Sequence, residues 1–111
     1  MMANTWQGKF PIINLVLDGY ERTSPVGSFP PNGYGLYDMA GNVLEWCWDW
    51  YGTNYGQPTI TNPKGPTTGT DRVLRGGDWC GDAIIARCAY RSFSYPDLAA
   101  YLVGFRCVRE R

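Results

Sequence analysis

Glycine and proline recur along the whole chain and leave little room for long regular elements. The 111 residues include 14 glycines and 8 prolines, which are dense in residues 21–36 and 51–71. Both residue types favour turns over helix interiors and strand ladders. Aromatic residues make up 15% of the chain, including five tryptophans and eight tyrosines. These features predict one domain that is poor in helix, with ordered loops packed through their aromatic side chains.

Four segments mix apolar, aromatic and charged residues at roughly alternate positions, a pattern typical of strands. Residues 43–50 form the densest apolar stretch and are expected to be the central strand. The other three predicted strands are 72–79, 86–91 and 103–109. One helical turn is possible at 36–39, and Trp46, Trp48 and Phe105 are expected in the core.

The two segments between the C-terminal strands, 80–85 and 92–102, show no period and are predicted to be loops. They nevertheless carry many large apolar side chains: Ile84, Ile85, Phe93, Tyr95, Leu98, Tyr101 and Leu102. Such a loop either folds back onto a core or presents a contact surface.

Charge and hydropathy exclude several partners. Lysine plus arginine and aspartate plus glutamate number 10 each, so no generic attraction to nucleic acid or an anionic membrane is expected. No apolar run reaches membrane-spanning length, and no signal peptide is recognisable. The default expectation is a cytoplasmic protein, or one displayed through a partner or a virion.

The four cysteines, Cys47, Cys80, Cys88 and Cys107, are irregularly spaced and contain no CxxC pair. Two disulfides, a metal site or free buried thiols are all compatible with this number, and the expected compartment favours free thiols. The chain has no histidine. A zinc site would therefore need all four thiols, and the usual general base near neutral pH is missing.

Several motifs together resemble the formylglycine-generating enzyme (sulfatase-modifying factor) superfamily. They are NTWQGKFP, DGYERTSPVGSFPPNGYGLYDMAGNVLEW, NPKGP, DRVLRGG, RCAYR and VGFRCVR, in that order along nearly the whole chain. The resemblance implies a variant C-type-lectin-like fold, classed as α+β. Its short antiparallel strands, long packed loops and little helix would form a single domain over residues 1–111.

The resemblance also implies two calcium sites, built from the hard oxygen donors that Ca²⁺ prefers. The first would use the side chains of Asn4 and Asp18 with the carbonyls of Thr5 and Tyr20. The second would use the side chains of Asp38 and Glu45 with the carbonyls of Gly41 and Val43. The alternative is that these side chains cap turns and bind backbone amides without metal.

The catalytic motif of the family departs here from its usual form. The enzymes resembled use two cysteines between the GG turn and the RCAYR-like segment to bind copper and activate oxygen, with a serine directly after GG. This chain has Asp78 at the serine position and only Cys80 in the interval. One thiolate without a second cysteine or a histidine is a poor Cu(I) site. We therefore expect no copper and no enzymatic activity.

Variable proteins of diversity-generating retroelements share this fold, and their adenine-directed variation ends near the C-terminus. Variation at AAC or AAT codons excludes Lys, Glu, Gln, Met and Trp, and the loop positions of the segment 78–102 satisfy that rule around fixed residues such as Trp79. The candidate variable positions are Asp78, Cys80, Gly81, Asp82, Ile84, Ile85, Ser92, Phe93, Ser94, Tyr95, Asp97, Leu98, Tyr101 and Leu102. The expected partner is an unidentified protein or other macromolecule. The alternative is a binding or structural relative without diversification.

Overall fold

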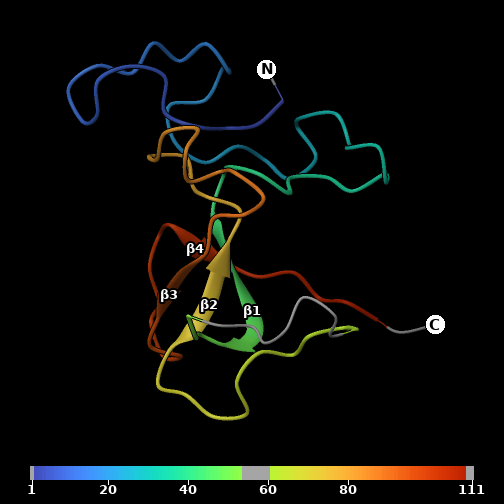
Figure 1. Cartoon of the computed structure of the whole chain (residues 1–111). Coiled ribbons are helices and arrows are strands. Elements are labelled where there is room, and N and C mark those ends of the chain that lie inside the picture. The colour runs from blue at the N-terminus through green and yellow to red at the C-terminus, as the bar shows by residue number, and fades with distance from the viewer. Residues whose placement is uncertain (1, 54–60, 110–111) are drawn as a thin grey trace.

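The computed structural model describes residues 2–53 and 61–109 and contains one small curled sheet (Figure 1). Its strands are β1 (Leu44–Trp50), β2 (Arg72–Arg75), β3 (Ser92–Ser94) and β4 (Val103–Gly104), in the order β3-β2-β1-β4. The β1–β2 and β2–β3 pairs are antiparallel, whereas β1 and β4 run parallel. The sheet is therefore mixed, and the expectation of antiparallel strands alone is wrong.

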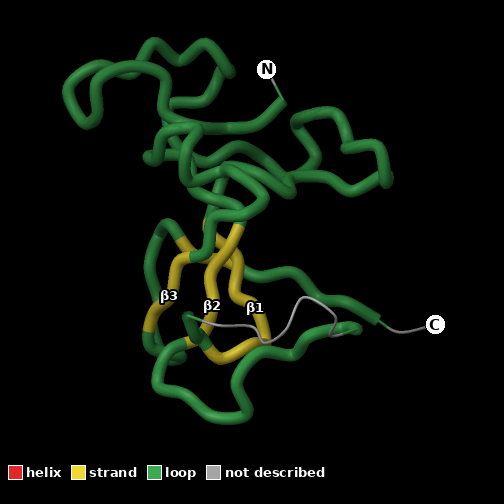
Figure 2. The backbone as a smooth tube through the Cα atoms, in the orientation of Figure 1, coloured by secondary structure: helices red, strands yellow, loops and turns green. Residues whose placement is uncertain are grey.

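Loops form the rest of the described chain, as the tube in Figure 2 shows. No helix occurs in residues 2–53 and 61–109, so the α+β label is not confirmed and the possible turn at 36–39 does not form. It follows that no helix in this part of the chain could cross a membrane. Of the predicted loop 51–71, residues 54–60 lie outside the described residues.

The predicted strand at 43–50 is confirmed as β1, but the C-terminal strands are shorter or displaced. The strand predicted at 72–79 ends at Arg75, because Gly76 and Gly77 adopt φ angles of 94° and 72°. Such angles suit glycine and turn the chain out of the ladder. A Cβ atom on Gly77 would also lie 3.0 Å from the Ala86 backbone. This turn requires glycine both for its φ angle and for its close approach.

The prediction of a strand at 86–91 is wrong. This segment consists of turns, and strand β3 follows it at residues 92–94. Arg75 explains the displacement. Its Nη1 atom donates to the carbonyls of Cys88 (2.6 Å) and Tyr90 (3.3 Å), which fixes the segment against the end of β2.

The core is small and centres on β2. In the described part of the chain, the buried apolar side chains are Val73, Leu74 and Phe29. The prediction that Trp48 and Phe105 belong to the core is wrong, since they are 87% and 76% exposed. A bulge explains Trp48: four steps along β1, from Trp46 to Trp50, match only two along β2. The extra residues turn Trp48 away from the sheet.

The N-terminal loops gather at one end of the sheet and are joined by buried polar groups (Figure 1). Asn42 is central: its Oδ1 accepts from the Ser24 amide (2.9 Å) and from Asn4 Nδ2 (3.3 Å), and its Nδ2 donates to the Ser24 carbonyl (3.2 Å). Asn4 Nδ2 also donates to the Arg22 carbonyl at 2.6 Å. Gly41 must be glycine, because a Cβ would lie 2.2 Å from the Asn4 carbonyl oxygen.

Candidate functional site

The first residues of the candidate variable segment form a closed turn. Asp78 is buried, and its Oδ1 accepts from the amides of Cys80 (3.1 Å) and Gly81 (2.8 Å) and from the Cys80 thiol (3.1 Å). The Gly81 carbonyl in turn accepts from the Trp6 amide at 3.1 Å. Asp78 is therefore part of the scaffold, whereas Cys80 and Gly81 are half-buried in the turn that it closes.

The following loops and strand β3 expose five of their large side chains. The exposed fractions are 58% for Ile84, 51% for Phe93, 66% for Tyr95, 41% for Leu98 and 78% for Tyr101. The backbone beneath them is ordered by turn hydrogen bonds, such as Leu98 N to the Tyr95 carbonyl at 3.0 Å. We call these five residues the outward set.

The other candidate positions divide between solvent and scaffold. Asp82 and Asp97 are exposed, whereas Ile85, Ser92, Ser94 and Leu102 are half-buried. Ile85 packs over Gly81, where an added Cβ would lie 1.9 Å from Ile85 Cδ1. The predicted segment thus mixes contact and supporting residues.

Distant aromatic residues support two members of the outward set. Tyr101 lies next to Trp79 (ring centroids 6.4 Å apart), which lies next to Trp6 (6.3 Å). Phe93 stacks on Tyr51 at 4.2 Å, and the Arg91 guanidinium lies 5.0 Å from the Tyr51 ring centroid. The sequence reasoning missed Trp6 and Tyr51 as supporting residues, because no local pattern links them to loops so far along the chain.

The cysteines do not form a reactive pair. All four lie in the described ranges and carry free thiols, with Cys88 and Cys107 exposed, not buried as expected. Desolvation, together with the hydrogen bond and negative charge of Asp78, raises the pKa of Cys80 to about 11. Cys80 therefore stays a protonated thiol near neutral pH. Within residues 2–53 and 61–109, no three Cys, Asp or Glu side chains lie close enough to hold a metal ion.

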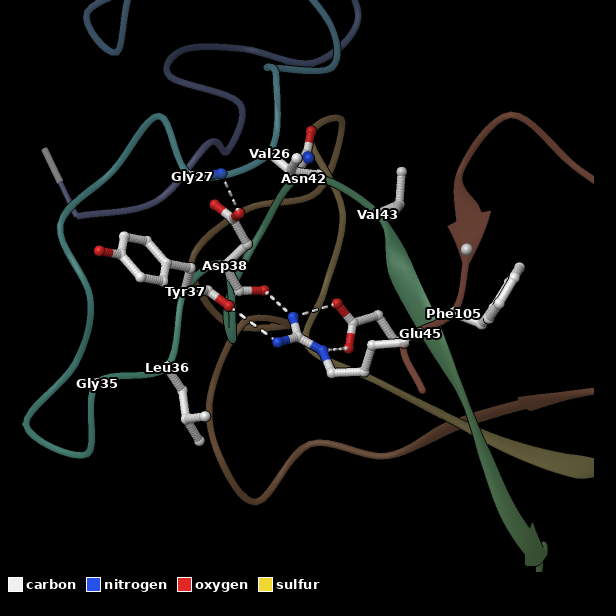
Figure 3. A pocket seen from close by; sticks show the side chains of 12 residues that line it. Val26, Gly27, Gly35, Leu36, Tyr37, Asp38, Asn42, Val43, Glu45 and Phe105 are labelled. Atoms are coloured by element: carbon white, nitrogen blue, oxygen red, sulfur yellow. Dashed lines mark hydrogen bonds and ion pairs between the residues drawn. The ribbon is translucent and has the colours of Figure 1, made fainter. Parts of the chain in front are cut away.

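Of the second predicted calcium site, Asp38 and Glu45 lie near one another in Figure 3, and Arg106 is hydrogen-bonded to both. Arg106 contacts both carboxylate oxygens of Glu45 at 2.5 Å and donates to the carbonyls of Tyr37 (3.0 Å) and Asp38 (2.8 Å). The Asp38 carboxylate accepts from the Gly27 amide at 2.7 Å. Hydrogen bonding to Glu45 raises the pKa of Arg106 further, so its charge is permanent. This arrangement does not fit a calcium ion, because a guanidinium already neutralises Glu45.

Of the first predicted calcium site, Thr5 and Tyr20 contact Asp18, whereas the Asn4 side chain binds Arg22 and Asn42 instead. Asp18 Oδ2 accepts from the Thr5 amide (3.2 Å) and Gln7 Nε2 (2.8 Å), and its Oδ1 accepts from the Tyr20 amide (3.0 Å). The Thr5 carbonyl, a predicted ligand, accepts from Gln7 Nε2 at 2.6 Å. These contacts match the turn-capping alternative, and calcium binding here stays a prediction.

Comparisons with known proteins agree with the motifs. The model of the sulfatase-modifying factor enzyme 1-like domain matches residues 1–111. The formylglycine-generating enzymes of Mus musculus and Streptomyces coelicolor are 50% and 47% identical over 97% of the chain, which spans 30% and 36% of those proteins.

Two solved structures resemble the fold. PvdO from Pseudomonas aeruginosa has a TM-score of 0.77 and 37% identity, with 94% of this chain matching 37% of that chain. Treponema denticola variable protein 1 has a TM-score of 0.70 and 41% identity, with 78% of this chain matching 32% of that chain. The chain therefore spans about a third of the length of these relatives. It belongs to the sulfatase-modifying factor family of formylglycine-generating-enzyme-like domains.

Proposed function

We propose that this chain is a non-catalytic binding protein whose C-terminal loops present a diversified contact surface to a protein or other macromolecule. The observation that carries the proposal is the outward set: four large side chains exposed on loops and one, Phe93, exposed on strand β3. Large apolar side chains on the surface are available for contact with a partner.

The chemistry of the outward set suits recognition. Tyrosine and phenylalanine offer a large contact area for few rotatable bonds, as in antibody combining sites. Here Tyr51 packs against Phe93, and Trp79 lies beside Tyr101. A preorganised side chain loses less entropy when it binds. The similarity to Treponema denticola variable protein 1 supports the same function.

A second candidate is a formylglycine-generating oxidase, favoured by the 50% identity to the mouse enzyme. Against it stand the single cysteine in the interval after the GG turn and the protonated state of Cys80. We expect no copper-dependent and oxygen-dependent conversion of cysteine in a sulfatase-motif peptide. Aldehyde formation at a rate above that of a Cys80→Ala variant would establish the enzyme instead.

The diversification proposal is tested on the genome that encodes the chain. We expect a reverse transcriptase gene and a near-identical repeat whose differences fall at adenines in the codons of the outward set. The codons of Val73, Leu74 and Asn42 serve as the control and are expected to be constant. A genome without the repeat, or differences spread equally over scaffold codons, would contradict diversification.

A further inference from the structure

The molecule exposes more surface than a compact domain of its size. Its accessible area is 8349 Å², whereas a folded monomer of this mass exposes about 6,200 Å². Its radius of gyration is 15.1 Å, against about 13 Å for a compact domain of this length. The excess area, on the order of 2,000 Å², is comparable to that buried in a large permanent interface.

Part of this surface is a groove beside β4, with a volume of about 550 Å³ (Figure 3). Apolar side chains of Val26, Leu36, Tyr37, Val43 and Phe105 line it. Val26 is 88% and Phe105 76% exposed, and Leu36 and Tyr37 are each about half exposed. None of these residues belongs to the candidate variable segment, so the groove is a second surface.

The groove suits apolar side chains more than a small charged ligand. Three charged groups line it: Glu45 and Arg106 form an ion pair, and the Asp38 carboxylate accepts a hydrogen bond from the Gly27 amide. Covering the Glu45–Arg106 pair leaves neither of these two charges unpaired, which lowers the cost of burying them. The groove therefore accepts an apolar partner and gives an anion no free counter-charge.

The neighbouring sheet edge is open as well. β4 is the last strand of the order β3-β2-β1-β4, so its outer side pairs with no strand of the described residues. An open edge is a template for an added strand from another polypeptide segment. Groove and edge together define a site for an extended segment with apolar side chains.

The relatives indicate what kind of polypeptide fits. In PvdO, well over half of the chain lies outside the part that matches this fold with a TM-score of 0.77. The mouse and Streptomyces enzymes likewise extend far beyond the match. We propose that the groove and the β4 edge bind a polypeptide that supplies the remaining part of the family fold, with apolar side chains packed against Phe105 and Val26.

The test compares one substitution in two contexts. In a chimera, this whole chain replaces the matching part of the Streptomyces coelicolor enzyme. We expect Phe105→Asp and Val26→Asp to lower the melting temperature of the chimera by about 10 °C, because each places a charge in a covered apolar site. In the chain alone, where both side chains are exposed, the same changes are expected to have little effect.

Trp48→Asp is the matched control, because Trp48 is 87% exposed and lies outside the groove. It removes a contact with Arg72, whose guanidinium lies 5.1 Å from the Trp48 ring centroid, and is expected to shift the melting temperature of both proteins equally. Small shifts for Phe105→Asp and Val26→Asp in a folded chimera would overturn the proposal. So would a sedimentation experiment in which the chain alone forms a dimer that Phe105→Asp dissociates, since the groove would then bind a second copy.

If the chimera does not fold, a binding experiment tests the proposal instead. The remaining part of the Streptomyces enzyme is then added to the chain as a separate polypeptide. We expect a one-to-one complex in sedimentation, lost in Phe105→Asp and retained in Trp48→Asp. Absence of a complex with the unaltered chain would overturn the proposal.

Discussion

Strand β2 and the loops that follow it carry similar apolar residues but use them differently. In β2, Val73 and Leu74 are buried, because the strand lies between β1 and β3 and is covered by both neighbours. In the loops, Ile84 and Tyr101 have comparable or larger side chains and stay exposed. Position in the sheet, not residue type, decides which apolar side chains form the core and which remain available for contact.

The largest expected loss of stability comes from β2. Leu74→Ala removes a buried side chain from a small core and is expected to lower the free energy of unfolding by about 2–5 kcal/mol. Leu98→Ala is the matched control: the same side chain is removed from a position that is 41% exposed. Urea unfolding of both variants measures the difference, and equal losses would remove the distinction between strand and loop.

Asn42 is expected to rank second. Asn42→Ala leaves the Ser24 backbone groups and the Asn4 amide without their partner, at a cost of roughly 1–3 kcal/mol. Asn42 also has a positive φ of 67°, which is a strained conformation for alanine. Asn62→Ala controls for that effect, because Asn62 has φ 50° and is exposed. A similar loss in both variants would assign the effect to the backbone alone.

The ionisation of the Cys80 thiol makes the stability of the folded chain depend on pH. Its pKa is raised from 9.0 to about 11, so the folded state retains a proton that the unfolded state loses earlier. This stability is complete below about pH 9 and is lost as the pH rises toward 11. At pH 9, alkylation is expected to be slow at Cys80 and faster at exposed Cys88, as followed by mass spectrometry.

The change Asp78→Asn removes the charge that faces the thiol and is expected to accelerate alkylation of Cys80 at pH 9. Equal alkylation rates at Cys80 and Cys88 in the unaltered chain would contradict the buried position of the turn.

The smallest effect is expected at Glu45. Because its ion pair with Arg106 is partly exposed, Glu45→Gln is expected to change stability by no more than about 1 kcal/mol, less in high salt. The same variant tests the calcium prediction. If calcium binds at Glu45, added calcium raises the melting temperature of the unaltered chain but not of Glu45→Gln, and a chelator reverses the rise.

The sequence predicted those features that depend on local pattern. The alternation at 43–50 identified β1, and the mixture of Ile84, Tyr95 and Tyr101 in unpatterned loops indicated outward side chains. Contacts between distant segments could not be predicted from the sequence. The bulge that exposes Trp48 depends on pairing with β2, and the burial of Asp78 depends on the turn that its own carboxylate closes. Neither the bulge in β1 nor the turn at Asp78 produces a periodic pattern in the sequence.

The displaced strand β3 has a similar cause. Arg75 binds the carbonyls of Cys88 and Tyr90 and prevents the preceding segment from pairing. Among the candidate contact residues, sequence alone also could not separate Ile85, which packs over Gly81, from its exposed neighbour Ile84. Side chains of the same chemistry at adjacent positions differ only in the direction that the fold gives them.

The central claim is that the outward set is carried by a scaffold that does not need it. The direct test is urea unfolding of a variant in which Ile84, Phe93, Tyr95, Leu98 and Tyr101 are all replaced by serine. We expect a cooperative transition whose free energy of unfolding is lowered by less than in Leu74→Ala. A fivefold variant that is unfolded in buffer, or less stable than Leu74→Ala, would show that these residues belong to the core and would contradict the account.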